Sequence, residues 1–352
     1  MKIFIDAMGG DFAPQAPVEG AIEALRRYPQ IEVVLAGVIP EIEKYLVDCD
    51  DVRSRISLLD APEVITNEES PVMGVRRKTK SATVMGMLQL REKEVDGFVS
   101  AGSTGAVLAG GMFRLGRIPG IERPALAPML PNGKGYVLLI DCGANVDCKP
   151  EYLIQFGMMG TAYMQGVMQM PNPRVGLVNI GAEAEKGNAL VKETYPLMEK
   201  APYNFVGNVE ARDVMADVAD ILVADGFAGN LILKNTEGVA MALLGIIKKE
   251  LMADFSGKLA GLIGKPAFKR VKKLMDYTEV GGAPLLGVQG AVVKAHGSSN
   301  AHAFSCAIGQ VIKMIEGNVV SIIEKGVENA SANACSLCTP VPVTCDTATL
   351  PN

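Results

Sequence analysis

The sequence predicts an α/β fold in which short buried strands alternate with helices around a mostly parallel sheet. Short runs rich in Val, Ile and Leu recur along the chain, and most end at a cluster of Gly, Asp, Asn or Ser. The stretches between these runs show helical patterns, as repeated βα units require. The 38 glycines suit many tight turns and loops where the backbone approaches a ligand.

The expected strands follow in chain order, and the polar loops after them locate the expected binding site. We expect strands at Ile3–Ile5, Val33–Ala36, Ile56–Leu59, Gly97–Ser100, Tyr136–Ile140, Val175–Asn179, Asn204–Gly207 and Ile221–Ala224. Ligands bind beyond the carboxyl ends of parallel strands. The loops of interest are therefore 6–11, 100–105, 141–145, 179–181 and 225–230.

The segment 239–276 is expected to form an amphipathic helical pair inserted in the domain. Apolar residues recur every fourth position on one stripe, at Leu243, Ile247, Leu251, Phe255 and Leu259. Gly264-Lys265-Pro266 is expected to break the helix, and a second helix should follow through Met275. Residues 1–325 then form a single catalytic domain, and residues 326–352 form a loosely ordered tail rich in Ala, Ser, Asn and Thr.

Composition and charge narrow the function classes. A net charge of −5 argues against nucleic-acid binding. The chain opens with only a short apolar run before Asp6, so we expect no secretory signal. No apolar run approaches the ~18 residues of a membrane-spanning helix. The seven cysteines are mostly scattered, as reduced thiols usually are, so we expect a cytoplasmic protein.

Several common active-site motifs are missing from the sequence. It has no G-x-G-x-x-G after the first strand, no P-loop and no G-x-S-x-G elbow. With two histidines, His296 and His302, a His-rich metal site is excluded. Cys335 and Cys338 resemble half a zinc site, but nothing completes it, so we expect no metal and no cofactor.

The remaining polar loops are suited to binding an anion such as phosphate. In Gly102-Ser103-Thr104-Gly105 the glycines allow close approach, the hydroxyls donate hydrogen bonds, and a helix is expected to begin at once. A plain helix N-cap explains Ser103 or Thr104 equally well.

Seven sequence blocks, taken in order, resemble the bacterial phosphate acyltransferases (the PlsX family). The blocks are Ile5-Asp6-Ala7-Met8-Gly9-Gly10-Asp11, Val99–Ala106, Gly120–Ala125, Asp141–Asn145, Val178–Gly181 with Glu185-Lys186-Gly187, Val223–Asn230, and Lys294-Ala295-His296-Gly297. The resemblance as a whole extends from residue 3 to about residue 324. The tail lies outside the resemblance.

The resemblance implies a three-layer α/β/α sandwich, similar to phosphotransacetylases and isocitrate dehydrogenases, with a protruding helical pair. It implies transfer of a long-chain acyl group from acyl carrier protein to inorganic phosphate, giving an acyl phosphate for phosphatidic acid synthesis. It also implies a homodimer with no metal or organic cofactor. An acyl-coenzyme A donor, or a non-catalytic scaffold for lipid synthesis, remain the alternatives.

Candidate roles follow from the resemblance and from the chemistry of each side chain. Ser103 and Thr104 are expected to bind phosphate and Lys186 to add a cation, while His296 is expected to act as the acid for the thiolate or as a donor to the oxyanion. Asn145 is a third candidate for catalysis. The remaining candidates for binding substrate or phosphate are Asp6, Gly9, Gly10, Asp11, Gly102, Gly105, Asn179, Asp225, Gly226, Asn230, Gly297 and Ser298. Each has a structural alternative, as a turn residue, a helix cap or a solvated side chain.

A basic cluster in the helical pair is expected to contact an anionic partner. It comprises Lys265, Lys269, Arg270, Lys272 and Lys273. Beside apolar residues such as Leu262 and Phe268, these cations suit an anionic membrane surface or the acidic carrier protein. Peripheral membrane contact would help to pass the product to a membrane glycerol-phosphate acyltransferase. A dimer-packing helix with a solvated basic face is the alternative.

Overall fold

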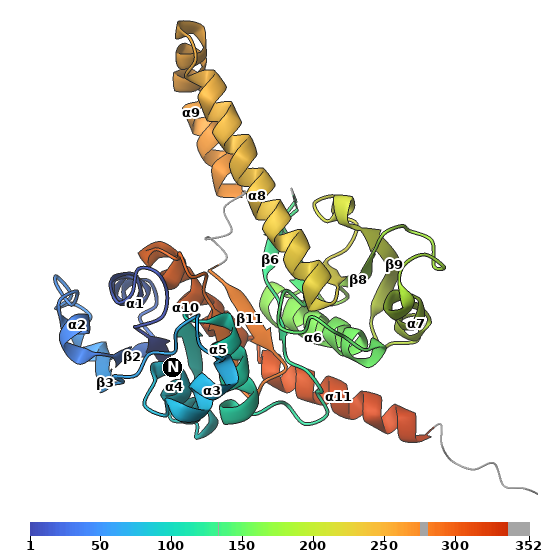
Figure 1. Ribbon diagram of the computed structural model, residues 1–352, viewed down its shortest axis with the longest axis horizontal. Coiled ribbons are helices and arrows are strands. Elements are labelled where there is room, and N and C mark those ends of the chain that lie inside the picture. Colours follow the sequence, from blue (N-terminus) through green and yellow to red (C-terminus); the bar gives the residue numbers. More distant parts are fainter. Residues whose placement is uncertain (133, 275–280, 337–352) are drawn as a thin grey trace, which may run out of the picture.

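The computed structural model describes residues 1–132, 134–274 and 281–336 and contains two mostly parallel sheets (Figure 1). The larger sheet has the strand order β3 (Ile56–Asp60), β2 (Glu32–Gly37), β1 (Lys2–Asp6), β4 (Gly97–Ser100), β12 (Ala291–Lys294), β11 (Ala283–Leu286) and β5 (Ala125–Leu126). The smaller sheet has the order β6 (Met129–Pro131), β7 (Tyr136–Ile140), β10 (Ile221–Val223), β8 (Arg174–Asn179) and β9 (Asn204–Glu210). The antiparallel pairs are β11 with β12, β11 with β5, and β6 with β7.

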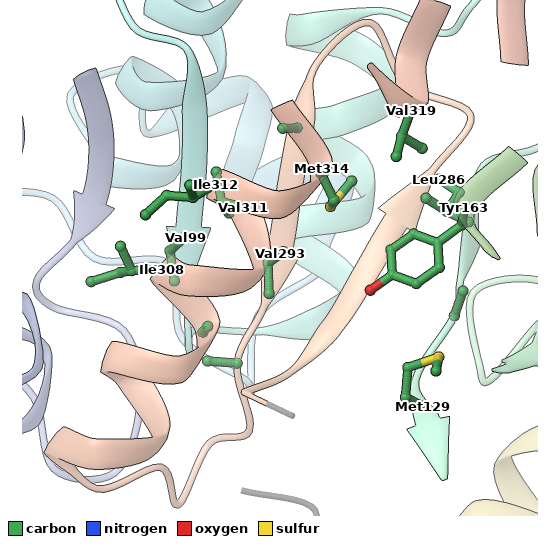
Figure 2. Close-up of a cluster of buried hydrophobic side chains, with 14 of the residues drawn as sticks. Val99, Met129, Tyr163, Leu286, Val293, Ile308, Val311, Ile312, Met314 and Val319 are labelled. Atoms are coloured by element: carbon green, nitrogen blue, oxygen red, sulfur yellow. The ribbon is translucent and has the colours of Figure 1, made fainter. Parts of the chain in front are cut away.

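Helices cover both faces of the larger sheet, because successive residues of its strands point to opposite sides. On one face, Ile3, Val99 and Val293 pack with α1 (Gln15–Arg27) and α10 (Ala301–Glu316). Figure 2 shows this cluster, in which Ile308 and Val311 of α10 lie over the sheet. On the other face, Phe4, Phe98 and Val292 pack with α4 (Ala82–Arg91) and α5 (Thr104–Gly110). This is the three-layer arrangement that the resemblance implies.

The smaller sheet is covered mainly by α6 (Pro150–Met168), whose Phe156 and Met159 pack against strands β7, β8 and β10. The other helical segments are α2 (Ile39–Glu43), η1 (Arg53–Arg55), α3 (Pro71–Arg77), η2 (Gly111–Leu115), α7 (Ala189–Met198), η3 (Ala211–Asp213), α8 (Gly226–Leu251), α9 (Phe255–Leu274) and α11 (Val319–Ser336).

Helices α8 and α9 form a hairpin that projects far from the body of the molecule (Figure 1). The expectation of a protruding helical pair is confirmed, but its expected start and break are wrong. Helix α8 begins at Gly226, and the break lies between Leu251 and Phe255, where Asp254 accepts a hydrogen bond of 2.6 Å from the Gly257 amide. Pro266 lies inside α9 and does not end the helix. A proline removes one helical hydrogen bond, and a helix that packs against a neighbour can tolerate this loss.

Other differences concern the tail and the short strands. Helix α11 extends to Ser336, so the expectation of a loosely ordered tail from residue 326 is wrong for this part. Its buried Val319, Ile323 and Val327 continue a helical spacing beyond the expected boundary. The expected strands are all present, but β5, β6, β11 and β12 and the division into two sheets were not predicted. Met275, the side chains of Lys272 and Lys273, and residues 337–352 lie outside the described part.

Candidate active site

Three loops of the larger sheet meet at one edge. Strands β1, β4 and β12 are neighbours and run parallel, with Ile5 beside Val99 and Ser100 beside Lys294. Their carboxyl ends therefore bring loops 6–11, 101–104 and 295–299 together. The amide of Asp11 donates to the carbonyl of Gly297 over 2.8 Å, which joins the first loop to the third.

Glycines allow these loops to touch. A Cβ atom at Gly9 would lie 2.5 Å from the backbone nitrogen of Gly102, so no side chain fits there. Gly10 has a φ of +104°, which other residues rarely adopt, and its Cβ would lie 3.0 Å from the Gly297 carbonyl oxygen. Both positions thus hold the three loops at backbone contact distance.

Asp6 organises these loops from inside the protein. Its Oδ2 accepts hydrogen bonds from Ser100 Oγ (2.8 Å) and Thr83 Oγ1 (3.1 Å), and its Oδ1 accepts one from the Met8 amide (3.1 Å). Ser100 Oγ in turn accepts from the Gly102 amide over 3.0 Å. Burial raises the pKa of Asp6, and the hydrogen bonds from Ser100, Met8 and Thr83 oppose that rise. Asp6 is therefore a positioning residue, which agrees with the structural alternative stated for it and not with direct contact to phosphate.

We expect Asp6→Ala to lower the free energy of unfolding by about 2–3 kcal/mol, since it leaves buried donors without their acceptor. Asp60→Ala is the matched control, because Asp60 also ends a strand but is exposed, and we expect it to change stability by less than ~0.5 kcal/mol. Urea unfolding measures both. Equal stability of the two variants would contradict the buried network.

A polar hollow of about 320 Å³ opens beside these loops. Its lining includes Asp6, Gly9, Gly10, Asp11, Glu63, Glu68, Thr83, Gly102, Ser103, Thr104, Lys294 and Gly297. The carboxylates of Glu63 and Glu68 would repel an anion from part of this surface. Asp6 and Asp11 add further carboxylates to this lining, so an anion is best placed where it can contact the Lys294 ammonium directly.

A larger hollow of about 410 Å³ lies between the two sheets. One part of its lining is apolar and includes Leu126, Pro128, Met129, Leu130, Leu233 and Ala283. The polar part includes Thr104, Asn230, Lys234, Glu237, Lys294, His296 and Ser299. Thr104, Lys294 and Gly297 line both hollows, so these residues mark the junction between them.

Lys294 is a buried cation at this junction. Its side chain is 8% exposed, and its Nζ donates to the carbonyl of Ala101 over 3.2 Å and to that of Ala295. An ammonium group has three N–H donors, so one more can be directed to a ligand. Burial lowers the pKa of Lys294 to about 8, against the opposing charges of Asp6 and Asp11. The group is therefore mostly charged at neutral pH but titrates close to it.

His296 lies at the rim of the larger hollow and is held by its own loop. Its Nδ1 accepts from the Ser298 amide (3.2 Å) and lies 2.8 Å from Ser298 Oγ. Burial, and then the charge of Lys234, lower the pKa of His296, so the ring is neutral at pH 7 and, with Nδ1 as acceptor, carries its proton on Nε2. A neutral ring of this kind donates a hydrogen bond more readily than it gives up a proton. The geometry thus favours the oxyanion-donor role over the acid role.

Helix α5 begins at the junction. Ser103 is its N-cap residue but makes no capping hydrogen bond with its side chain, so the plain N-cap explanation does not account for Ser103. Its hydroxyl and the first amides of α5 are suited to donate to an anion.

The structure brings together only some of the expected site residues. Asp6, Gly9, Gly10, Asp11, Gly102, Ser103, Thr104, Asn230, His296 and Gly297 line one or both hollows. Gly105 packs against Pro71, and Ser298 supports His296.

Like Gly105 and Ser298, five further expected site residues are not among those lining either hollow. Asn145 Nδ2 donates to the Pro124 carbonyl (2.8 Å) and to Asp141 Oδ2 (3.1 Å). Asp225 caps α8 by accepting from the Ala228 amide, and the Gly226 amide donates to the Asn145 carbonyl. Asn179 ends β8, and Lys186 lies in the loop that follows it. Asn179 closes this loop through the Lys186 carbonyl, and Lys186 Nζ pairs with Glu183 at 2.9 Å on an exposed surface. Catalytic roles for Asn145 and Lys186 stay predictions.

Sequence reasoning did not single out Lys294, Lys234 or Glu237. Lys294 is the first residue of the block Lys294-Ala295-His296-Gly297 and ends β12, a strand that was not predicted. Its place in that block was the feature of the sequence that could have indicated a site residue. Lys234 and Glu237 lie on α8 and pair at 2.8 Å. Only the path of α8 past the larger hollow places them there.

The chemistry available at the junction is anion binding beside an apolar wall. Cys142 lines the larger hollow, but burial and the charge of Asp141 raise its pKa well above the usual thiol value, so it is a poor nucleophile. Lys294, Ser103 and His296 can donate to negative charge, and the apolar wall can hold a hydrocarbon chain. Within residues 1–132, 134–274 and 281–336, no three Asp, Glu, His or Cys side chains are grouped as metal ligands.

Comparison with known proteins identifies similar chains. A sequence family described as "Fatty acid synthesis protein" matches residues 1–322. A phosphate acyltransferase of Alkaliphilus oremlandii is 50% identical over 329 residues, covering 94% of this chain and 98% of that protein. A phosphate acyltransferase of Clostridium tetani is 47% identical with the same coverage. The fold is similar to that of a phosphotransacetylase from Streptococcus pyogenes, with a TM-score of 0.57 at 14% identity over 93% of this chain and 94% of that one.

Proposed function

The chain belongs to the phosphate acyltransferase family, and from this premise we propose that it transfers a long-chain acyl group from the thioester of acyl carrier protein to inorganic phosphate. The acyl phosphate would serve phosphatidic acid synthesis. The observation that carries the proposal is the junction, where a buried cation separates an apolar hollow from a polar one.

The two hollows suit the two substrates. The apolar wall formed by Leu126, Met129 and Leu233 suits the hydrocarbon next to the thioester. Phosphate is placed against Lys294, Thr104 and the start of α5, where a cation and helix amides favour an anion. Because Lys294 and Thr104 line both hollows, this placement brings a phosphate oxygen next to the thioester carbonyl.

The proposed reaction is a direct displacement. A phosphate oxygen attacks the thioester carbon, and the carbonyl oxygen becomes an oxyanion. The Nε2–H of His296 donates to that oxyanion, a contribution of about 3–4 kcal/mol for one such donor. The carbon–sulfur bond then breaks and the carrier leaves as a thiolate, which at a pKa of roughly 8.5 needs no strong acid. Holding the two substrates together can supply ~7–11 kcal/mol more.

We expect the affinity for phosphate to fall as pH rises through about 8, the pKa to which burial lowers Lys294. The sign follows from the charge: the ammonium binds the anion, and the neutral amine formed at higher pH does not. Phosphate itself becomes more negative over this pH range, which would strengthen its binding. A loss of affinity would therefore have to come from the protein. The KM for phosphate between about pH 7 and 9 measures it. A KM that stays constant would remove Lys294 from the phosphate site.

The nature of the acyl donor is tested by assaying acyl phosphate from palmitoyl-acyl carrier protein and from palmitoyl-coenzyme A, each with phosphate. A higher kcat/KM with the carrier protein supports the proposal. A preference for the coenzyme A thioester would instead support the acyl-coenzyme A alternative, and no turnover with either donor would support the scaffold.

The hairpin is proposed to serve partners outside the active site. Apolar side chains are exposed on both helices, at Val239, Met241, Leu243, Ile246, Phe255, Leu259, Leu262 and Ile263. Among the described helices, α8 by itself has the length and composition of a membrane span, yet Asn230, Lys234 and Glu237 commit its first turns to the larger hollow. We propose that the chain is a cytoplasmic homodimer that uses the hairpin for dimer and peripheral membrane contact, and the exposed apolar side chains of the hairpin support this proposal. There it would deliver acyl phosphate to a membrane glycerol-phosphate acyltransferase.

Charge reversal on α9 tests the membrane contact. Lys265, Lys269 and Arg270 are exposed beside apolar residues of the same helix. We expect Lys265→Glu/Lys269→Glu/Arg270→Glu to lower binding to anionic vesicles in a flotation assay, since each cation near such a surface contributes about 1 kcal/mol.

The matched control for this experiment is Lys44→Glu/Lys192→Glu/Lys200→Glu, which reverses three exposed charges on the body of the protein. Equal vesicle binding by the two triple variants would reject α9 as the membrane contact.

A further inference from the structure

Three side chains on the outer face of the larger sheet form a hydrogen-bonded series that is separate from the proposed active site. Cys306 and His302 lie on α10 and Glu23 lies on α1, which packs against α10. The Cys306 Sγ is 3.7 Å from His302 Nε2, and His302 Nδ1 is 2.8 Å from Glu23 Oε1. The spacing of four residues along α10 places the thiol and the imidazole on one helix face.

The succession of thiol, imidazole and carboxylate is the arrangement that activates a nucleophile. A carboxylate can only accept from a neutral imidazole, so Glu23 favours the tautomer with the proton on Nδ1. The lone pair of Nε2 is then directed to the Cys306 thiol and can take its proton. A thiol within reach of a base that a third group orients is the arrangement found in nucleophilic catalysis.

The thiol also faces a small hollow with basic residues. Cys306 lines a hollow of about 170 Å³ together with Arg27, Tyr28, Met168 and Lys313. Cations beside a thiol favour the thiolate, whereas burial of the thiol opposes it, so the activating group is the imidazole of His302. The small volume, and the 8% exposure of Cys306, restrict access to small reagents and exclude a long acyl chain.

The other described cysteines lack this environment. Burial raises the pKa of Cys142 well above its usual range and that of Cys148 to about 12, and both have neighbouring acids that raise it further. Cys49 is buried in the apolar core. None of these three lies within hydrogen-bond distance of a described histidine, and in the part of the chain that the structure describes Cys306 is the cysteine so placed.

We propose that Cys306 is a nucleophilic thiol that small hydroperoxides oxidise to a sulfenic acid, with His302 as its base and Glu23 as a positioning residue. His302 Nε2 takes the thiol proton, and the thiolate sulfur attacks one oxygen of hydrogen peroxide. The O–O bond breaks as the S–O bond forms, and the departing hydroxide takes the proton from His302 to give water. The sulfur loses two electrons and the peroxide gains them.

The test is the rate of sulfenic acid formation at each cysteine of the full chain. The protein is treated with hydrogen peroxide and dimedone, and the adducts are quantified peptide by peptide by mass spectrometry. Cys306 is expected to react at least about tenfold faster than Cys49, Cys142 or Cys148, the ratio that one pKa unit of thiolate population gives. Labelling of Cys306 no faster than that of these three would overturn the proposal.

Two substitutions separate activation from folding. His302→Gln is expected to lower the Cys306 rate about tenfold, with labelling of Cys49 unchanged. Glu23→Gln is expected to lower it less, and the double variant should be no slower than His302→Gln alone, because Glu23 acts through His302. An unchanged Cys306 rate in His302→Gln, or independent additive losses in the double variant, would contradict the roles assigned to these residues.

Discussion

Replacing Lys294 by Met is expected to lower kcat/KM for phosphate about 10²–10³-fold, the loss that follows removal of one well-placed donor to a reacting anion. The ammonium is the buried cation shared by the two hollows, and its Nζ is held by the carbonyls of Ala101 and Ala295. Met keeps the length of the side chain and fills the same space. The substitution also removes the cation that faces the buried Asp6 and the donor to the two carbonyls, so we expect some loss of stability, and urea unfolding has to show that the variant is folded under the assay conditions.

Lys186→Met is the matched control for this substitution. The sequence assigned the phosphate cation to Lys186, whereas the structure places that side chain on an exposed loop, paired with Glu183. We expect Lys186→Met to keep most of the activity. A large loss in Lys186→Met together with normal kinetics in Lys294→Met would contradict the proposed phosphate position and return it to the loop after β8.

Replacing His296 by Gln is expected to lower kcat about 10²-fold, with a smaller effect on the KM for phosphate, since an oxyanion donor acts mainly in the transition state. Gln keeps a side-chain amide but not the position of Nε2 that the Ser298 hydrogen bonds fix. Because the pKa of His296 is lowered by burial and by Lys234, wild-type kcat should not decline as pH rises through 7.

His302→Gln is the control for the imidazole. His302 pairs with Glu23 on the outer face of α10 and is not among the residues that line either hollow. We expect normal acyl transfer from this variant. An equal fall of kcat in His296→Gln and His302→Gln would indicate a general structural effect on α10 and the loop before it, and would contradict an oxyanion donor at His296.

The strands and their polar ends could be predicted because local sequence determines them. Runs such as Ile3–Ile5 and Gly97–Ser100 are apolar and bounded by turn residues, and parallel strands place their following loops at one edge. The glycine-rich loops at 6–11 and 102–105 were therefore named among the loops of interest, and the structure brings Gly9 against Gly102.

What could not be predicted depends on contacts between distant segments. Strand β12 has four residues and pairs with β4, which is distant in the sequence. The strand was therefore not predicted, and the position of Lys294 at its end was not recognised. The first turns of α8 line the larger hollow, and no local pattern shows which turns of a long helix face a cavity. Asn145 was expected in catalysis for its polar loop, but its amide donors are used by Pro124 and Asp141.

Helix α8 connects the two parts of the proposed function. Its first turns carry Asn230, Lys234 and Glu237 at the larger hollow, and its far end leads into the exposed hairpin (Figure 1). A partner bound to the hairpin therefore lies at the other end of the same helix that lines the acyl site. The proposed delivery of acyl phosphate at a membrane would use this arrangement.

The measurement that most directly tests direct displacement is a single turnover of palmitoyl-acyl carrier protein with excess enzyme, with and without phosphate. Release of the carrier thiol and the intact mass of the enzyme are followed together. Attack by phosphate itself predicts that thiol release requires phosphate and that the enzyme mass stays unchanged in both reactions. Thiol release without phosphate, accompanied by a palmitoyl adduct on the enzyme at Cys142 or elsewhere, would show an acyl-enzyme intermediate and contradict the proposed reaction.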